Sequence, residues 1–221
     1  KSLRTNLDFM AGSMDVHTLV ITSTVPEESK SNVAVNLALT LAESGKKVAL
    51  VDCDLRKPVL HRYLKAGHNV KGVSNVLSNQ CTLDEALQEL KEMNLTFLPA
   101  GTPPPNPSEM LSQPQMQAMV NTLREKFDVV IFDAPPVSVV TDAAVIGRYV
   151  DGAMFVVRSD YAPADAVRGA VKKLQDAGVR VLGSVLTRYD MKKALKGSSY
   201  AYSYAYNYNY AYENQKADVA E

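Results

Sequence analysis

The sequence predicts an α/β fold, a mostly parallel twisted sheet with helices on both faces, followed by a tyrosine-rich C-terminal tail. Three observations predict it. Short β-rich runs alternate with stretches of helical period, and these runs are apolar on both faces, as in a covered parallel sheet. Seven of the 11 tyrosines gather in one segment near the C-terminus. We therefore expect a folded domain over residues 1–196 and a tail of biased composition over 197–221.

The elements are expected in a regular order along the chain. Leu19–Ile21 is the first strand, and the helix from Ser31 to Ser44 follows it with an Ala, Leu and Val period that ends at Gly45. Further strands are expected at 48–51, 95–98, 129–132, 153–157 and 181–186, and further helices at 114–126, 142–149 and 164–177. The proline-rich stretch 103–107 reads as a rigid loop. In such a sheet, ligands bind beyond the C-terminal ends of the strands.

The composition excludes several classes of protein. Lys+Arg and Asp+Glu both number 24, and this neutral balance argues against a general nucleic-acid binder. The apolar stretches are far shorter than the roughly 20 residues that a bilayer span needs. Two cysteines cannot form a disulfide framework, so we expect a reducing, cytoplasmic location.

The first strand leads through a loop into Lys30-Ser31 and a helix, which is the context of a Walker A phosphate loop. In that interpretation Lys30 reaches the β- and γ-phosphates and the Ser31 hydroxyl binds Mg²⁺. Backbone N–H groups near the helix start would surround the phosphate oxygens. The expected nucleotide-binding residues are therefore Glu27, Glu28, Ser29, Lys30, Ser31 and Asn32.

Two glycines of the Walker A pattern are replaced, by Thr24 and by Ser29. Glycine at the second position allows unusual backbone dihedrals close to phosphate. A serine there would cost ~1 kcal/mol or more if its φ is positive. Glu27 and Glu28 also bring negative charge near the phosphates. A plain strand-to-helix turn is the alternative interpretation of this loop.

Carboxylates follow two of the other expected strands. Asp52 and Asp54 come after one strand, and Asp133 comes after another as in a Walker B pattern. If the strand geometry continues past Asp52, the side chains of Asp52 and Asp54 point to the same side. One carboxylate could then hold Mg²⁺ while the other accepts a proton from a hydroxyl nucleophile. Thr141-Asp142, just beyond Asp133, could be a helix N-cap pair or could support the site indirectly.

Together these segments resemble the bacterial tyrosine kinases of capsule and exopolysaccharide biosynthesis, which are P-loop ATPases of the deviant-Walker, MinD/ParA-like type. The matching pieces span nearly the whole chain: Lys30-Ser31, 51–56, 133–136, 3–7, 99–109 and the tyrosine-rich end. The resemblance implies an ATP- and Mg²⁺-dependent tyrosine kinase. It implies that Lys30 and Asp52 are catalytic, with Asp52 as the base for the incoming tyrosine, and that Ser31, Asp54 and Asp133 bind the metal. Thr187 stands where related ATPases usually carry an asparagine that reads adenine.

The same resemblance implies how the protein works with others. Family members assemble into rings, octamers among them, in which one subunit's tail enters the next subunit's site, and Arg4 matches a ring-closing motif. The tail tyrosines would be autophosphorylated: Tyr200, Tyr202, Tyr204, Tyr206, Tyr208, Tyr210 and Tyr212. The implied partners are a transmembrane polysaccharide co-polymerase, which would activate the kinase at the inner face of the plasma membrane, and a cognate tyrosine phosphatase. Two alternatives stay open, a MinD/ParA-like nucleotide-switch ATPase and a catalytically impaired scaffold of the same fold.

Overall fold

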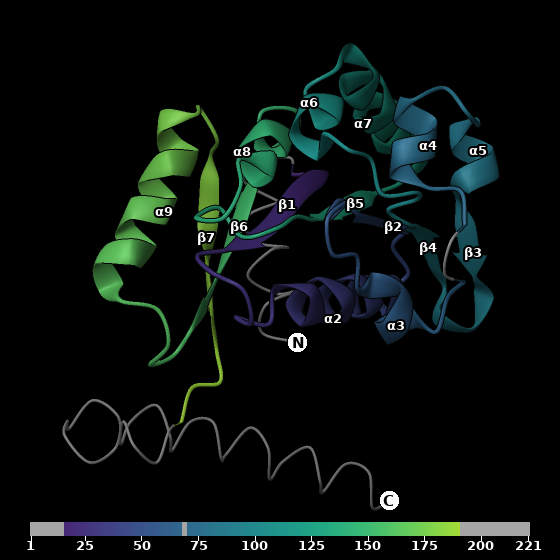
Figure 1. Ribbon diagram of the computed structural model, residues 1–221. Coiled ribbons are helices and arrows are strands. Elements are labelled where there is room, and N and C mark those ends of the chain that lie inside the picture. Colours follow the sequence, from purple (N-terminus) through teal and green to yellow (C-terminus); the bar gives the residue numbers. More distant parts are fainter. Residues whose placement is uncertain (1–15, 68–69, 191–221) are drawn as a thin grey trace, which may run out of the picture. The chain divides into compact units, whose positions relative to one another are not determined.

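The computed structural model describes residues 16–67 and 70–190, and its centre is a seven-stranded sheet (Figure 1). The strand order is β3-β4-β2-β5-β1-β6-β7, and every neighbouring pair is parallel except β3 with β4. The strands are β1 Thr18–Ser23, β2 Val48–Asp52, β3 Gln88–Leu90, β4 Leu95–Leu98, β5 Val129–Asp133, β6 Gly152–Arg158 and β7 Val181–Thr187. The predicted α/β fold with a mostly parallel sheet is confirmed.

Helices cover both faces of this sheet (Figure 1). Helices α4, α5, α6, α7, α8 and α9 pack against one face of the sheet through one buried cluster. Helices α2 and α3 pack against the other face through a second cluster. The helices are α2 Lys30–Glu43, α3 Leu60–Leu64, α4 Val73–Leu77, α5 Leu83–Ala86, α6 Pro107–Leu111, α7 Pro114–Lys126, α8 Asp142–Gly147 and α9 Ala164–Asp176, with a 3₁₀ turn η1 at Lys91–Met93. Among the described residues, no helix is both long and apolar enough to cross a membrane.

The sequence explains the central elements directly. All residues of β1, β2 and β5 are buried, which is why these strands are apolar on both faces. Helix α7 begins with Pro114 in its first turn, where a missing N–H costs nothing, and buries one stripe that includes Met116 and Leu123. Gly45 takes a left-handed φ of 88° just after α2, as a helix-ending glycine does.

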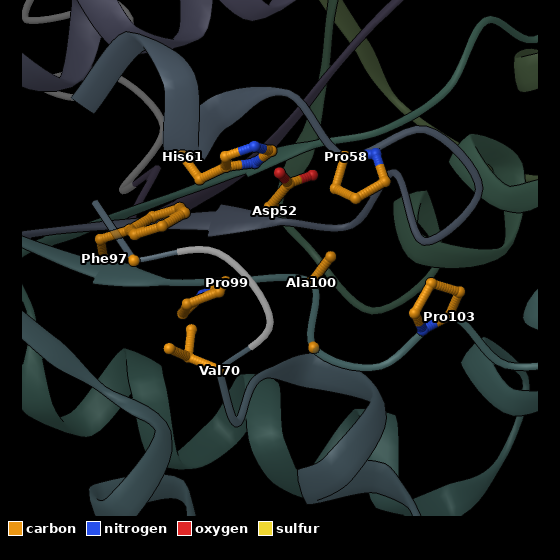
Figure 2. A pocket seen from close by; sticks show the side chains of 10 residues that line it. Asp52, Pro58, His61, Val70, Phe97, Pro99, Ala100 and Pro103 are labelled. Atoms are coloured by element: carbon orange, nitrogen blue, oxygen red, sulfur yellow. The ribbon is translucent and has the colours of Figure 1, made fainter. Parts of the chain in front are cut away.

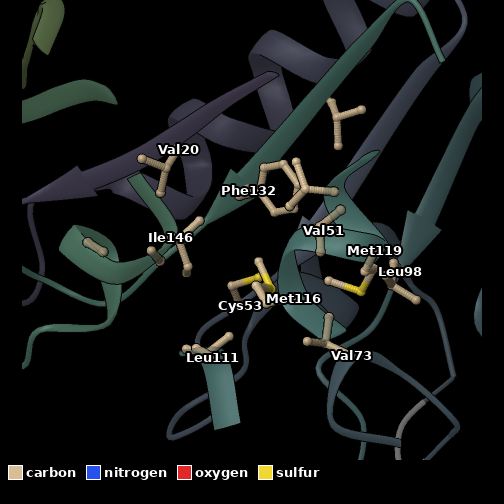
Figure 3. Packing of buried hydrophobic residues seen from close by; sticks show 14 of the residues in the cluster. Val20, Val51, Cys53, Val73, Leu98, Leu111, Met116, Met119, Phe132 and Ile146 are labelled. Carbon is tan, nitrogen blue, oxygen red and sulfur yellow. The ribbon is translucent and has the colours of Figure 1, made fainter. Parts of the chain in front are cut away.

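Cys53 belongs to the apolar core (Figure 3). It lies among residues of α6 and α7, including Leu111 and Met116, and is fully buried. Burial raises the pKa of its thiol well above the ordinary value. The cysteine between the two acids therefore packs as a small hydrophobic residue.

Several short elements were not expected from the sequence. The described chain also contains α3, α4, α5, α6 and the edge strand β3. Helix α6 begins at Pro107, so the predicted rigid loop ends one residue earlier than its last proline. The predicted domain boundary at residue 196 lies outside the described residues.

Candidate functional site

The candidate residues gather at the C-terminal edge of three adjacent strands. In the sheet β5 lies between β2 and β1, and their register pairs Asp133 with both Asp52 and Ile21. The loops after these strands are 24–29, 53–59 and 134–141. The three motifs therefore meet at one edge, which is where open α/β sheets bind ligands.

The amine of Lys30 lies at the centre of this edge. Its Nζ is 3.1 Å from the Ser31 Oγ and 3.3 Å from an oxygen of Asp54 and from both carboxylate oxygens of Asp133. Burial lowers the pKa of Lys30, but the nearby carboxylates, Asp133 foremost, raise it above the ordinary value. The ammonium is thus a permanent positive charge surrounded by oxygen atoms.

Asp133 ends β5 and is fully buried. It accepts a short hydrogen bond from the Ser31 hydroxyl and pairs with Lys30. Burial raises the pKa of Asp133, and these two partners only partly oppose that rise. Both partners come from the first turn of α2, so the start of this helix and the end of β5 are joined directly.

The residues around Lys30 have the chemistry of a magnesium site. Four oxygen atoms of Ser31, Asp54 and Asp133 converge within 3.3 Å of one cationic nitrogen. Across residues 16–67 and 70–190, no group of three or more His, Cys, Asp and Glu side chains is placed to hold a metal. Magnesium at nucleotide sites usually needs only one or two carboxylates, because phosphates and waters complete its shell. The donor set therefore fits Mg²⁺ bound together with a nucleotide.

Asp52 ends β2 next to Asp133, and its carboxylate bonds to the backbone of the loop that follows. Its carboxylate accepts hydrogen bonds from the backbone N–H groups of Asp54 and Leu60, each at 3.2 Å, and lines a hollow of about 40 Å³ beside His61 and Phe97 (Figure 2). Burial, and then the charge of Asp133, raise the pKa of Asp52 to about 8. Asp52 and Asp54 were expected to share one side if the strand continued past Asp52, and this condition is not met, because β2 ends at Asp52.

The loop before α2 takes a glycine-like backbone conformation at one of its two replaced glycine positions, Ser29, and also at Glu27. Ser29 has φ 70° and ψ 22°, and Glu27 has φ 66°, so both lie in the left-handed region. The Ser29 side chain makes no capping hydrogen bond to α2. Thr24, at the other glycine position, is fully buried, and its hydroxyl lacks a hydrogen-bond partner among the described residues. The left-handed backbone at Ser29 carries strain that glycine would remove.

Glu28 holds this loop closed. Its side chain is buried and accepts hydrogen bonds from the backbone N–H of Val25 at 2.9 Å and of Arg158 at 3.1 Å. The Thr187 hydroxyl donates to the Glu28 carbonyl at 3.0 Å. The carboxylate is therefore used within the loop, and its support by Arg158 and Thr187, 130 and 159 residues away, was not predictable from a local pattern.

A cavity of about 400 Å³ opens above Lys30, Ser31 and Asp54. Its charged floor is bordered by apolar walls, with Pro136 and Val139 on the β5 side and Val59 and Tyr63 on the β2 side. Tyr63 and Val139 are both about half exposed although they are large and hydrophobic. Pro26, Glu27 and Ser29 line the loop side of this cavity, whereas Glu28 is buried within the loop.

The remaining predicted residues take other places. Asn32 is exposed, and its side-chain oxygen accepts a hydrogen bond from Asn36 at 2.9 Å. Thr141 makes no capping hydrogen bond, and the Asp142 carboxylate instead pairs with Arg56 at 3.1 Å, so Asp142 is not a simple cap. Arg4 and the seven tail tyrosines lie outside the described residues.

Comparison with known proteins gives consistent matches over most of the chain. The model of the AAA domain family matches residues 28–150. Tyrosine-protein kinase YwqD of Bacillus subtilis is 35% identical over 90% of this chain and 83% of its own length. Putative tyrosine-protein kinase CapB of Staphylococcus aureus is 34% identical over 90% of this chain and 86% of its own length. A putative tyrosine-protein kinase in cps region, from Klebsiella pneumoniae, is 32% identical, but the match spans only 26% of that longer protein and 84% of this chain.

Solved structures agree with the sequence matches. The kinase domain of Escherichia coli tyrosine kinase ETK superposes with a TM-score of 0.81 at 33% identity, covering 84% of this chain and 72% of that one. The septum site-determining protein MinD of Pyrococcus horikoshii, solved with Mg-ADP, gives a TM-score of 0.68 at 24% identity, covering 78% of this chain and 70% of that one. The second likeness shows a shared fold.

Proposed function

Because this chain belongs to the family of bacterial tyrosine kinases and carries an AAA domain, we propose that it transfers phosphate from ATP to tyrosine hydroxyls. One observation carries the proposal: the Lys30 amine, the Ser31 hydroxyl and two carboxylates converge beneath an open cavity. Phosphoryl transfer depends mainly on positioning and on charge stabilisation, and this cluster can supply both.

Each residue of the cluster has a part in the proposed reaction. Lys30 would leave the carboxylates to bind the β- and γ-phosphates, and the backbone N–H groups of 27–31 would surround the phosphate oxygens. Ser31, Asp54 and Asp133 would hold Mg²⁺, which supplies charge neutralisation when it is bound. The Asn32 side chain points toward Asn36, so any contribution from residue 32 would come through its backbone.

Asp52 stays in the proposal as the base for the acceptor hydroxyl. A pKa of about 8 lies near the operating range of a general base. To reach an acceptor, its carboxylate would have to give up its bonds to the N–H groups of Asp54 and Leu60. The apolar walls formed by Val139 and Tyr63 suit the aromatic ring of that acceptor.

We also propose the assembly that the family resemblance implies. The seven tail tyrosines would be the acceptors, phosphorylated between subunits of a ring, an octamer in the simplest case, that Arg4 helps to close. Full phosphorylation would add roughly −10 to −14 charges to one short segment, and repulsion between tails would then favour disassembly. A transmembrane co-polymerase would recruit the kinase to the inner face of the plasma membrane, and a tyrosine phosphatase would reset it. This cycle would regulate the polymerisation and export of capsular or extracellular polysaccharide.

The test uses the full chain incubated with Mg-ATP and probed with an antibody against phosphotyrosine. We expect a signal in the wild type that Lys30→Met abolishes. Lys172→Met is the matched control, because Lys172 is an exposed lysine of α9 that pairs with Asp176 on the same helix. A signal that persists in Lys30→Met, or that is absent from the wild type, would contradict the proposed activity.

The left-handed Ser29 favours one second candidate, a scaffold with impaired turnover. Strain at this residue would weaken phosphate binding without changing the fold. Nucleotide affinity separates the two candidates: a scaffold would bind Mg-ATP weakly or not at all in calorimetry, whereas a kinase would bind it and show turnover.

A further inference from the structure

A partly buried ion pair joins the loop that carries Asp54 to helix α8, which follows Asp133 along the chain. Arg56 donates from Nε to Asp142 at 3.1 Å and from Nη2 to the Ser108 hydroxyl at 2.9 Å. Ser108 in turn donates a short hydrogen bond to Asp142. We call these three residues the Arg56 clamp. The Asp142 side chain has no exposed surface, while that of Arg56 is 38% exposed.

The clamp connects segments that are distant in the sequence. Arg56 lies two residues after Asp54, in the loop between β2 and α3. Asp142 opens α8, which the chain reaches from Asp133 through residues 134–141. The clamp therefore ties the loop of one candidate metal ligand to the helix that follows the other.

Asp54 needs such an anchor because regular structure does not hold it. Strand β2 ends at Asp52, two residues earlier. Asp54 Oδ1 accepts the backbone N–H of Lys57 at 3.0 Å, so the carboxylate is fixed relative to its own loop. The backbone also ties this loop to the sheet, because the Cys53 N–H donates to the Asp133 carbonyl at 2.9 Å and the Asp54 N–H donates to the Asp52 carboxylate at 3.2 Å. The clamp adds a side-chain anchor on the other side of Asp54. Magnesium demands near-octahedral geometry, and a ligand that shifts by a fraction of an ångström loses its place in the shell.

The chemistry of the clamp suits this task. A guanidinium presents its donors in a rigid planar fork, so it fixes direction as well as distance. The buried carboxylate of Asp142 pairs with the Arg56 guanidinium among the described contacts. A shift of the Arg56 loop would leave this carboxylate buried without a cation, which costs free energy. The loop therefore has one strongly preferred position.

From these contacts we infer that Arg56, Ser108 and Asp142 are positioning residues that hold Asp54 in register with Asp133 for magnesium. The inference rests on the proposed function, because it requires that the site bind a magnesium nucleotide. It assigns a role to Asp142 that a helix cap would not have.

The test compares ADP affinity with and without Mg²⁺ by calorimetry on the full chain. Asp142→Asn removes the charge opposite Arg56, and we expect it to reduce the Mg²⁺-dependent gain in ADP affinity at least tenfold. Affinity for ADP without metal should stay within about twofold, because the phosphate loop is untouched. Arg56→Lys keeps the charge without the fork and should show part of the same loss.

The matched control is Asp151→Asn. Asp151 pairs with Arg124 and also binds the start of β1, but it lies at the opposite end of the strands. This variant should lower the melting temperature and leave the Mg²⁺-dependent gain unchanged. If Asp142→Asn does not fold, Ser108→Ala removes one member of the clamp with less disturbance and should reduce the gain in the same direction.

Two failures can be told apart. In the first, the wild type gains ADP affinity with Mg²⁺ and all three variants, Asp142→Asn, Arg56→Lys and Ser108→Ala, keep that gain within twofold. This result would overturn the positioning role and leave the proposed function standing. A wild-type chain whose ADP affinity does not respond to Mg²⁺ would overturn both together.

Discussion

Replacing Ser29 with glycine should stabilise the protein, because the residue holds a left-handed backbone that its side chain does not favour. A non-glycine residue in this region costs about 1 to 2 kcal/mol. Glycine gains flexibility in the unfolded chain, which offsets about 0.4 to 1 kcal/mol. The midpoints of these two ranges leave a net gain in the free energy of unfolding of about 0.8 kcal/mol. For a domain of this size the melting temperature should rise by about 2 to 3 °C.

Ser29→Ala is the control that isolates the backbone effect. Alanine keeps the Cβ atom, and the serine side chain makes no capping bond that its removal would break. We expect Ser29→Ala to change the melting temperature, measured by differential scanning calorimetry without nucleotide, by less than about 1 °C. A rise with alanine as large as that with glycine, or a fall with glycine, would refute the assignment of strain to φ at this residue.

The same pair of variants tests the phosphate loop. Glycine lets the backbone approach a phosphate group more closely, so Ser29→Gly should bind Mg-ADP more tightly than the wild type. Ser29→Ala should not. Equal affinities of the three proteins in calorimetry would show that residue 29 does not limit nucleotide binding.

Two further predictions concern buried carboxylates. The pKa of Asp52 is raised to about 8, so its contribution to stability is full below about pH 4 and is lost as the pH rises through 8. Metal-free Asp52→Asn should therefore gain in melting temperature over the wild type between pH 6 and pH 9, and a constant difference would contradict this. The two carboxylate oxygens of Glu28 accept hydrogen bonds from the N–H groups of Val25 and Arg158. Glu28→Gln keeps only one of these oxygens, so the free energy of unfolding measured in urea should fall by about 1 to 3 kcal/mol. A Glu28→Gln midpoint equal to that of the wild type would argue against this.

Strongly patterned segments of this sequence were predictable, and short polar ones were not. Helix α7 has the predicted bounds, because Pro114 marks its start and an apolar stripe runs along it. Strand β3 has only the residues Gln88–Leu90, without a pattern of its own. It exists because it pairs with β4 across a short connection, which forces an antiparallel arrangement.

The candidate site divides in the same way. Lys30, Ser31, Asp54 and Asp133 were found because each stands at a motif position, and parallel topology brings such positions together. The backbone contacts of Asp52 were not predicted, because alternation of side chains holds only while a strand continues and the loop after β2 has no such pattern. The role of Asp142 was left open because its partner Arg56 lies 86 residues away, and no local pattern reports a contact over that distance.

The ammonium of Lys30 has a consequence for the order in which ligands arrive. In the structure this cation pairs with Asp54 and Asp133, the carboxylates that the proposed magnesium site would use. If that proposal holds, a free metal ion would have to displace a charge that the chain itself supplies. A triphosphate offers it a new partner. We expect metal and nucleotide to enter as one complex, with the lysine exchanging one set of oxygens for another.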